Sequence, residues 1–441
     1  MTHLTRRHAL LGMTALTLTA PALAACGGGA RPDGGEAGGG AGGGLTAWAL
    51  TGNKESMWQS EFDEWNSDNP DNTFDVEYMA NDAYKERIRT AVGAGNAPTL
   101  IFGWGGGTLA DYVDNDAVVE LTGQVEELNA QVIESVAAGG EVEGSVYAVA
   151  TGDTQPVVLY YNTEMFDEHG VTPPTTWDEL TEAISTFQDE GITPIALAGS
   201  SVWPELMYIQ YLTDRIGGED VFQRVQDNEP DAWSDPAIES ALEHIIELVD
   251  SGAFGDGFTS VVADGGADAA LVHTGRAAMI LQGSWVYNTF KEDAPEFVED
   301  GKLGYLNFPD IPDGDGDPAN IVGNTANYWS VSSAASEEEQ QQAIQFLNEY
   351  NLSDQSIEVL IADGAIPAVV DMESRLEESE DSGFLLHAYG MVQDAPHFQL
   401  SWDQALAPAP AQELLTNLSQ IFLRQIEPQE FIDNMNATIS S

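Results

Sequence analysis

Short apolar segments alternate with capped amphipathic helices from about residue 45 to the end of the chain. Residues 157–161 (Val-Val-Leu-Tyr-Tyr) form an unbroken apolar run, which is typical of a strand covered by helices on both faces. Thr176 and Glu179 have the spacing of a capping box, as do Ser336 and Glu339, and Asp235 precedes a proline at a helix start. This alternation predicts an α/β fold with mainly parallel sheets.

Seven segments are predicted as strands, namely residues 45–50, 73–79, 98–102, 157–161, 192–197, 277–281 and 328–332. Four tryptophans occupy helix stripes or helix starts, where core packing is the expected role: Trp58, Trp65, Trp177 and Trp233. About 400 residues are enough for two globular domains and too many for one core.

The N-terminal segment has the pattern of a bacterial lipoprotein signal. Arg6 and Arg7 precede an apolar stretch, residues 9–18, that is shorter than the ~20 residues of a membrane-spanning helix. Leu-Ala-Ala-Cys at residues 23–26 is similar to a lipobox, so we expect residues 1–25 to be a signal peptide and Cys26 to be lipidated. An ordinary secretory peptide with an incidental cysteine, and a twin-arginine signal, are the alternatives.

Residues 26–44 are predicted to be the lipidated cysteine and a tether. The tether is predicted because residues 27–44 hold 11 glycines. Such a composition cannot bury a core and behaves as a flexible linker. Cys26 is the only cysteine in the chain, so disulfides and thiol chemistry are excluded from the folded part.

The chain carries a net charge of −59 at pH 7. This excludes nucleic acid as a partner, because the phosphate backbone requires lysine and arginine. A uniformly acidic surface suits a protein that stays soluble at high salt, and an acidic site for a cationic ligand is the alternative explanation.

Signatures of catalysis and metal binding are missing from the sequence. No HExxH pair occurs, the glycine-rich residues 103–107 match neither GxGxxG nor a Walker loop, and 73 acids make any carboxylate pair uninformative. Residues 313–318 begin like a calcium loop but lack its later ligands, which indicates a solvated acidic turn. We therefore expect no enzyme activity, no cofactor and no metal.

Tryptophans beside small residues in predicted loops are the best candidates for a binding site. Trp104, Trp203, Trp285 and Trp402 have this setting. Tryptophan faces suit the CH faces of sugar rings, whose hydroxyls bond to nearby Asp, Asn and Gln.

Several motifs resemble those of the extracellular solute-binding proteins of carbohydrate ABC importers. They are Val-Tyr-Ala-Val at residues 146–149, Leu-Tyr-Tyr-Asn-Thr-Glu-Met-Phe at 159–166, the stretch 170–180, the G-x-A-A-M-x-x-x-G-x-W pattern at 275–285, the helix at 343–347, and Gly-Ala-Ile-Pro at 364–367. They occur in the family's order and cover essentially residue 45 to the end.

The resemblance implies a two-lobed periplasmic-binding-protein-like type II fold with discontinuous lobes joined by hinge crossovers. Lobe 1 would comprise residues 45–153 plus 327–363, and lobe 2 residues 154–326 plus 364–441. Trp104, Trp203, Trp285 and Trp402 would stack on a sugar in the interlobe cleft. The implied polar contacts are Asp403, Asn53, Glu55, Asp153, Gln155 and Asn324.

The implied function is that of a monomeric receptor that captures a sugar or oligosaccharide and delivers it to ABC permease subunits. It would be anchored by lipid to the cell membrane, on its extracellular side. The alternatives are a secreted oligosaccharide hydrolase, or the same fold binding a peptide, a polyamine or a phosphodiester.

Overall fold

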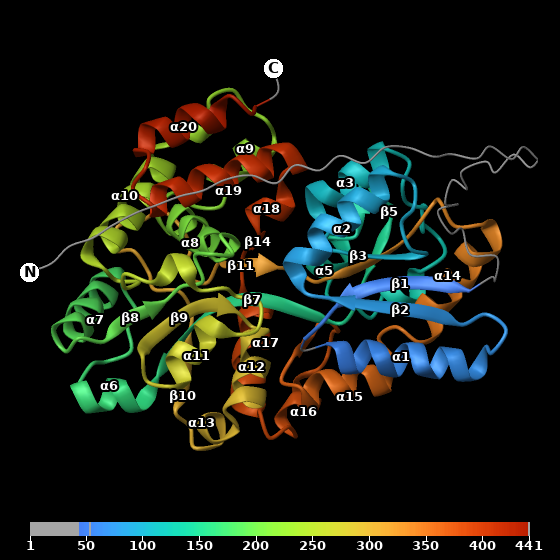
Figure 1. Ribbon diagram of the computed structural model, residues 1–441, viewed down its shortest axis with the longest axis horizontal. Coiled ribbons are helices and arrows are strands. Elements are labelled where there is room, and N and C mark those ends of the chain that lie inside the picture. The colour runs from blue at the N-terminus through green and yellow to red at the C-terminus, as the bar shows by residue number, and fades with distance from the viewer. Residues whose placement is uncertain (1–43, 53, 440–441) are drawn as a thin grey trace, which may run out of the picture. The chain divides into compact units, whose positions relative to one another are not determined.

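The structure is a computed structural model that describes residues 44–52 and 54–439, and these residues form two β-sheets with helices packed around each (Figure 1). The two-lobed α/β fold predicted from the sequence is confirmed. The predicted signal peptide, Cys26 and the glycine-rich tether lie outside the described residues.

The first sheet has the strand order β2-β1-β3-β12-β6. Its strands are β1 (Leu45–Leu50), β2 (Phe74–Met79), β3 (Leu100–Gly103), β6 (Ala148–Ala150) and β12 (Tyr328–Val331). Strands β1, β2 and β3 are parallel, whereas β12 runs antiparallel to both β3 and β6.

The second sheet has the order β14-β11-β7-β9-β8, and β10 and β13 also pair with β7. Its strands are β7 (Asp153–Asn162), β8 (Thr193–Ala196), β9 (Ala277–Gly283), β10 (Leu303–Leu306), β11 (Ile321–Asn324), β13 (Ile366–Pro367) and β14 (Phe398–Leu400). The expectation of mainly parallel sheets is wrong here, because β7 runs antiparallel to β9, β10, β11 and β13. Strand β7 follows directly on the first sheet, and its beginning lies beside the end of β9, with Val157 opposite Gly283. The two strands are therefore antiparallel.

The chain changes sheet at three places: between β6 and β7, between β11 and β12, and between α15 (Asp354–Ala362) and β13. Lobe 1 denotes residues 45–153 plus 327–363, and lobe 2 denotes residues 154–326 plus 364–441. A short hairpin, β4 (Glu141–Val142) and β5 (Ser145–Val146), stands apart from both sheets.

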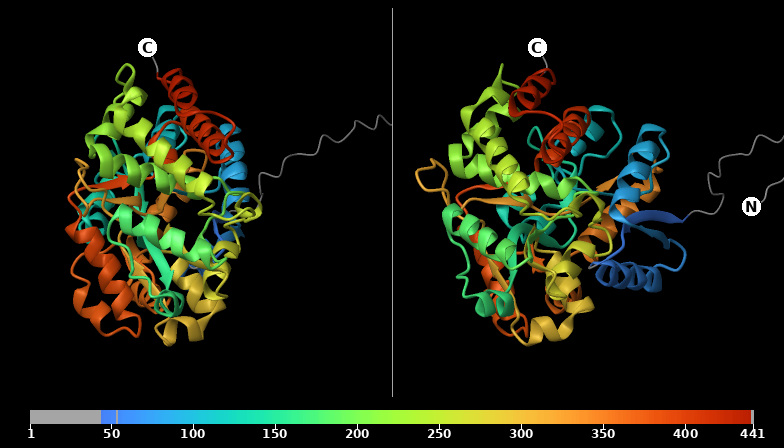
Figure 2. Two further views of the ribbon diagram at one scale, coloured as in Figure 1. Left: turned by 90° about the vertical axis from the view of Figure 1, so that its left-hand side faces the viewer. Right: turned by 60° about the vertical axis from the view of Figure 1, so that its left-hand side comes forward.

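The helices pack around the sheets in two groups (Figures 1 and 2). Lobe 1 carries α1 (Glu55–Asp68), α2 (Asn81–Gly93), α3 (Gly106–Asp114), α4 (Glu126–Asn129), α5 (Glu134–Ala138), α14 (Glu337–Glu349) and α15. Lobe 2 carries α6 (Thr163–His169), α7 (Trp177–Asp189), α8 (Leu206–Gly217), α9 (Asp220–Gln226), α10 (Pro236–Ser251), α11 (Ala267–His273), α12 (Val286–Asp293), α13 (Pro295–Glu299), α16 (Glu373–Glu377), α17 (Ser382–Asp394), α18 (Trp402–Ala405), α19 (Pro408–Phe422) and α20 (Pro428–Asn436).

The predicted helix caps are confirmed. The Thr176 side chain accepts a hydrogen bond from the backbone N–H of Glu179, whose carboxylate accepts the Thr176 N–H in return. Ser336 and Glu339 make the same reciprocal pair at the start of α14. Each box satisfies two backbone donors that the helix itself cannot pair.

Aromatic side chains fill the cores on both sides of the molecule. In lobe 1, Phe62 stacks on Phe346 with ring centroids 4.7 Å apart. The four tryptophans predicted to be core residues are buried. Burial of these rings supplies much of the apolar stabilisation, because an aromatic side chain removes more surface from water than most residues.

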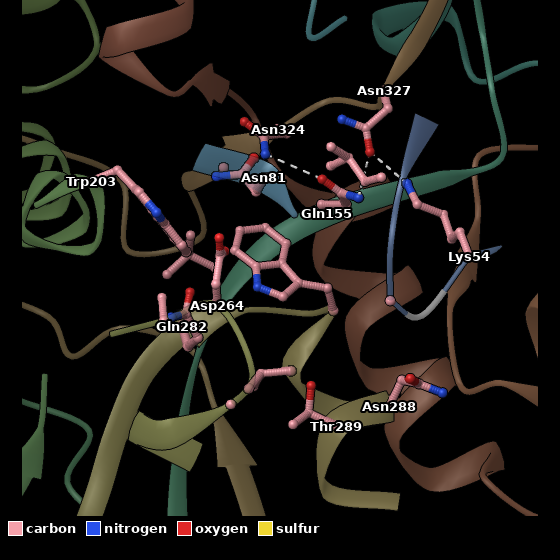
Figure 3. A pocket seen from close by; sticks show the side chains of 18 of the residues that line it. Lys54, Asn81, Gln155, Trp203, Asp264, Gln282, Asn288, Thr289, Asn324 and Asn327 are labelled. Carbon is pink, nitrogen blue, oxygen red and sulfur yellow. Dashed lines mark hydrogen bonds between the residues drawn. The ribbon is translucent and has the colours of Figure 1, made fainter. Parts of the chain in front are cut away.

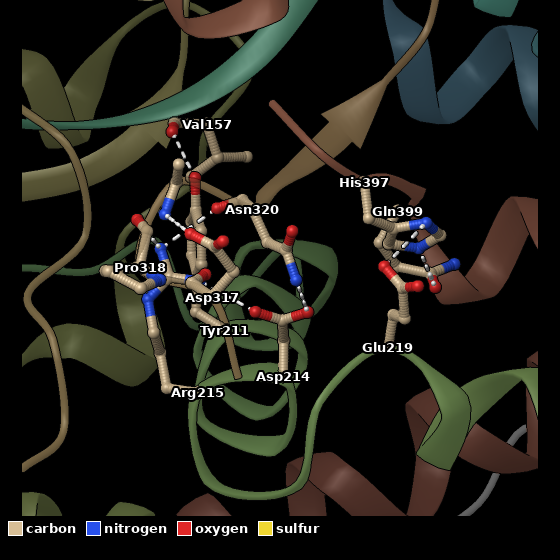
Figure 4. A network of polar contacts seen from close by, with 11 residues as sticks. Val157, Tyr211, Asp214, Arg215, Glu219, Asp317, Pro318, Asn320, His397 and Gln399 are labelled. Carbon is tan, nitrogen blue, oxygen red and sulfur yellow. Dashed lines mark hydrogen bonds and ion pairs between the residues drawn. The ribbon is translucent and has the colours of Figure 1, made fainter. Parts of the chain in front are cut away.

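The acidic turn at residues 313–318 keeps its Asp313, Asp315 and Asp317 side chains exposed, as predicted. Its backbone serves a second purpose that the sequence does not reveal (Figure 4). The fully buried guanidinium of Arg215 donates to the carbonyl oxygens of Asp317 and Pro318 at 3.2 and 3.0 Å, and it pairs with Asp214 at 2.7 Å. The turn thus supplies hydrogen-bond acceptors to a buried guanidinium whose charge is balanced by Asp214.

Among the residues that the structure describes, no group of three His, Cys, Asp or Glu side chains has the arrangement of a metal site. Within the same residues, no helix is long and apolar enough to cross a membrane.

Candidate functional site

A pocket of about 360 Å³ lies between the two sheets and is lined by both lobes (Figure 3). This volume is within the ~300–1,000 Å³ of typical ligand sites. Lobe 1 contributes Lys54, Asn81, Lys85 and Trp104, and lobe 2 contributes residues from the ends of β7, β9 and β11 and from α12 and α18.

Two partly exposed tryptophans form the aromatic wall of the pocket, which belongs to lobe 2. The rings of Trp203 and Trp285 have centroids 5.9 Å apart and planes tilted by 56°. Trp285 follows β9, and its ring lies against the backbone of Gly283, where a Cβ atom would stand 2.0 Å from the indole. The glycine two residues before the tryptophan therefore lets the ring lie flat at the strand end.

Trp203 is presented by a strained turn. Val202, directly before it, has φ 63° and ψ −51°, a conformation that β-branched residues rarely adopt. Strain of this kind persists where the surrounding structure enforces it, and it is frequent at binding sites.

Trp104 faces the pocket from lobe 1 but is only 8% exposed. Phe102 and Tyr84 pack against it edge to face at 5.4 and 6.0 Å, and the ammonium of Lys85 lies 4.9 Å from its ring centroid. Less of this ring is free for stacking than of Trp203 or Trp285.

A network of buried polar groups joins the pocket floor to the crossovers between the sheets. The ammonium of Lys54 pairs with Asp153 at 2.6 Å and donates to Oδ1 of Asn327 at 2.5 Å. The Gln155 amide donates to the same oxygen at 3.0 Å and accepts from Nδ2 of Asn324 at 3.2 Å. Burial lowers the pKa of Lys54, although the carboxylate of Asp153 opposes this.

Carboxylates line the side of the pocket formed by residues 263–266, the first turn of α11 and helix α12. Asp268 is buried and accepts a hydrogen bond from the amide of Gln282 at 3.0 Å. Burial raises the pKa of Asp268, Asp264 and Glu292. The two lysines that line this pocket, Lys54 and Lys85, are each paired with a carboxylate, so the wall offers acceptors rather than free cations.

Six of the residues predicted from the sequence line the pocket: Trp104, Trp203, Trp285, Gln155, Asn324 and Asp403. Asp153 lies beneath the floor as the partner of Lys54, and Glu55, the first residue of α1, is not part of the lining. Asn53 lies outside the described residues. Contact of any of these residues with a ligand remains a prediction.

Trp402 requires a correction. It is 1% exposed and stacks on Phe222 at 4.2 Å with parallel planes, and it meets Trp233 edge to face at 5.8 Å. The ring therefore belongs to the lobe 2 core and does not reach the pocket, whereas the next residue, Asp403, does.

Sequence reasoning missed Lys54, Lys85, Asp264, Asp268 and Gln282. Gln282 stands inside the G-x-A-A-M-x-x-x-G-x-W pattern at the end of a strand, so its position was a usable signal. Nothing in the local sequence of the two lysines marks them as pocket residues.

Several solved structures share this two-lobed fold. One, described in work on xylan utilisation by the thermophilic bacterium Caldanaerobius polysaccharolyticus, is 28% identical with a TM-score of 0.80, covering 90% of this chain and all of that one. A chitin oligosaccharide binding protein has the same TM-score at 22% identity, covering 90% of this chain and 98% of its own. The fold is thus that of a substrate-binding protein.

The family model of bacterial extracellular solute-binding proteins matches residues 48–355, and the chain belongs to this family. A xylose/arabinose-binding protein of Haloferax volcanii is 31% identical over 150 residues, which is 33% of this chain and 31% of that protein. A probable sugar-binding periplasmic protein of Rhizobium meliloti is 25% identical over 209 residues, 46% of this chain and 48% of that protein. Matches to the curated relatives span about a third to a half of their length.

Proposed function

We propose that this protein is the substrate-binding receptor of an ABC importer and that it captures a neutral sugar or oligosaccharide between its lobes. The observation that carries the proposal is the aromatic wall, Trp203 and Trp285, next to Asp268, whose carboxylate is held by the amide of Gln282. Indole faces pack against the CH faces of pyranose rings, and a held carboxylate accepts the hydroxyls at their edges. The named relatives that bind sugars support the same ligand class.

The test is a thermal shift panel of xylo-, chito- and malto-oligosaccharides with spermidine and a glucuronate-bearing xylo-oligosaccharide. A ligand that binds only the folded state raises the melting temperature by mass action. We expect a neutral oligosaccharide to raise it most and the glucuronate-bearing one to raise it least. A rise in melting temperature with spermidine alone would show that the ligand is a polyamine rather than a sugar. A polyamine is the second candidate because carboxylates line one side of the pocket.

A phosphodiester ligand is disfavoured by the charges at the site. Both pocket lysines already have carboxylate partners, and the remaining charged lining groups are acids. An anion entering this pocket would lose hydration without gaining a free cation.

Hydrolysis of the sugar is disfavoured by the placement of the protonated acids. A glycosidase needs one carboxylic acid that stays protonated near neutral pH beside the scissile bond. Burial raises the pKa of Glu61 and of Glu205 to about 8, yet neither residue lines the pocket. Burial also raises the pKa of the lining acids Asp264, Asp268 and Glu292, but hydrogen bonds from Gln282 and Ala269 to Asp268, and the charge of Lys85 near Asp264, favour the ionised forms of those two. Reducing-end release from the panel oligosaccharides would contradict the binding proposal.

We further propose that Cys26 anchors the receptor to the outer face of the cell membrane, where it acts as a monomer beside its permease. A glycine-rich tether leaves the receptor free to reorient while keeping its local concentration at the permease high. Cys26→Ser should shift the protein from the membrane fraction to the medium while sugar binding persists. Retention of the variant at the membrane would argue against lipidation.

A further inference from the structure

Helix α2 of lobe 1 reaches lobe 2 through the side chain of Lys85. The ammonium lies 3.7 Å from Oδ2 of Asp403, the second residue of α18. Asp403 is held in place by lobe 2, because its carboxylate accepts from the hydroxyl of Ser401 and from the amide of Gln404, both at 2.8 Å. The anion is thus positioned independently of lobe 1.

The N-terminal end of α2 makes a second contact with lobe 2. The backbone N–H of Asp82, in the first turn, donates to Oδ2 of Asp264 at 3.4 Å. A helix N-terminus carries partial positive charge, and a carboxylate there is stabilising. Lys85 also lowers the pKa of Asp264, against the effect of burial.

The backbones of the two lobes also touch beside Lys85. A Cβ atom on Gly106 would stand 2.4 Å from the carbonyl oxygen of Gln404, and one on Gly107 would stand 2.2 Å from that of Leu406. No side chain could be placed at these distances, so only glycine fits at the two positions. The backbone at the start of α3 is therefore in direct contact with the backbone of α18 and of the residue after it. The two lobes are therefore in direct contact on this side of the pocket.

We propose that Lys85 is a positioning residue that holds the two lobes together through its ion pair with Asp403, beside the contact of the α2 N-terminus with Asp264. Its ammonium lies over Trp104 of its own lobe at 4.9 Å, so the lysine keeps an aromatic partner when the lobes separate. A residue with a partner in the open form loses less side-chain freedom on closing.

The test measures the distance between the lobes directly. Spin labels on Thr90→Cys in α2 and Gln412→Cys in α19, in a Cys26→Ser background, report lobe separation by pulsed electron paramagnetic resonance; both positions are exposed. Distance distributions are recorded without ligand and with xylotriose or N,N′-diacetylchitobiose, at 0.05 and 1 M NaCl.

We expect Lys85→Met to lower the ratio of closed to open molecules by about three- to tenfold, as for a partly exposed ion pair that bridges two bodies. Asp403→Asn should have the same effect, and the double variant should add little, because both changes break one contact. High salt should reduce the difference between Lys85→Met and the parent.

Lys302→Met is the matched control. Lys302 pairs with Glu164 and Asp300 at 3.6 and 3.8 Å, similar distances, but both partners are in its own lobe. Identical distributions for Lys85→Met and the parent under all conditions would overturn the proposal. So would an equal change in the Lys302 control, or strictly additive effects of the Lys85 and Asp403 substitutions.

Discussion

Tryptophan has two distinct roles in this molecule, and neighbouring residues decide which role applies. Trp285 lies flat on Gly283 and keeps one face toward the pocket. Trp402 has a parallel ring, Phe222, at 4.2 Å and is buried. The first should therefore contribute to affinity and the second to stability.

Replacing each ring by alanine separates these roles. Trp285→Ala is expected to weaken sugar binding by about 1–3 kcal/mol with little change in the free energy of unfolding, because it removes a stacking face. Trp402→Ala is expected to lower the free energy of unfolding by about 3–5 kcal/mol, because it opens a cavity in the core. Isothermal titration calorimetry and urea unfolding measure the two quantities. If Trp285→Ala binds sugar normally, or if the variant unfolds, the assignment of Trp285 to the binding site is wrong.

The buried carboxyl of Glu205 should make the free energy of unfolding depend on pH. The residue is 1% exposed, and burial raises the pKa of its carboxyl from 4.5 to about 8. Between these values the folded protein keeps a proton that the unfolded chain has released, so the free energy of unfolding falls as pH rises, by at most about 1.4 kcal/mol per unit. Glu205→Gln cannot ionise and should reduce this fall by a few kcal/mol between pH 5 and 8.5.

Urea unfolding at the two pH values checks this expectation. Glu247→Gln, on the exposed face of α10, is the control and should leave the pH dependence unchanged. An unchanged slope in Glu205→Gln would mean that the carboxyl is ionised in the folded protein.

At the scale of elements, the glycine run at the start of α3 sets how closely the lobes approach. Gly107→Ala places a methyl group 2.2 Å from the carbonyl oxygen of Leu406. We expect this variant to weaken sugar binding by about tenfold or more, because α18 must move away before the pocket can close. Gly103→Ala, where the added methyl meets nothing within 4 Å, should bind normally. Isothermal titration calorimetry measures the sugar affinity of the two variants. Equal affinities would show that closure does not need the contact between Gly107 and Leu406.

Elements with local signals were predictable, and those fixed by distant partners were not. The seven predicted strands and the two capping boxes are present because apolar runs and the Thr-x-x-Glu or Ser-x-x-Glu spacing act within a few residues. The two- to four-residue strands β6, β10, β11, β13 and β14 were missed, since pairing across the chain defines them, and so was the short hairpin of β4 and β5. Trp402 was misplaced for the same reason, as its partner Phe222 is far away in sequence.

At the scale of the whole molecule, the net charge of −59 should make stability depend on salt. Self-repulsion destabilises the compact state, and screening relieves it. We expect the urea midpoint to rise between 0.05 and 1 M NaCl and then to level off, since the screening length falls to about 3 Å at 1 M. A midpoint that falls with salt would show that attractive pairs such as Arg224–Asp235 outweigh the repulsion.

The three crossings between the sheets determine when each lobe can fold. Lobe 1 begins at β1 but is incomplete without β12, α14 and α15, which end at Ala362. A chain that emerges from its N-terminus therefore cannot close the first core until about four-fifths of it is available, and contacts this distant in sequence form slowly. The connectivity that makes both lobes discontinuous should therefore keep the first core of the nascent polypeptide unfolded for most of its synthesis.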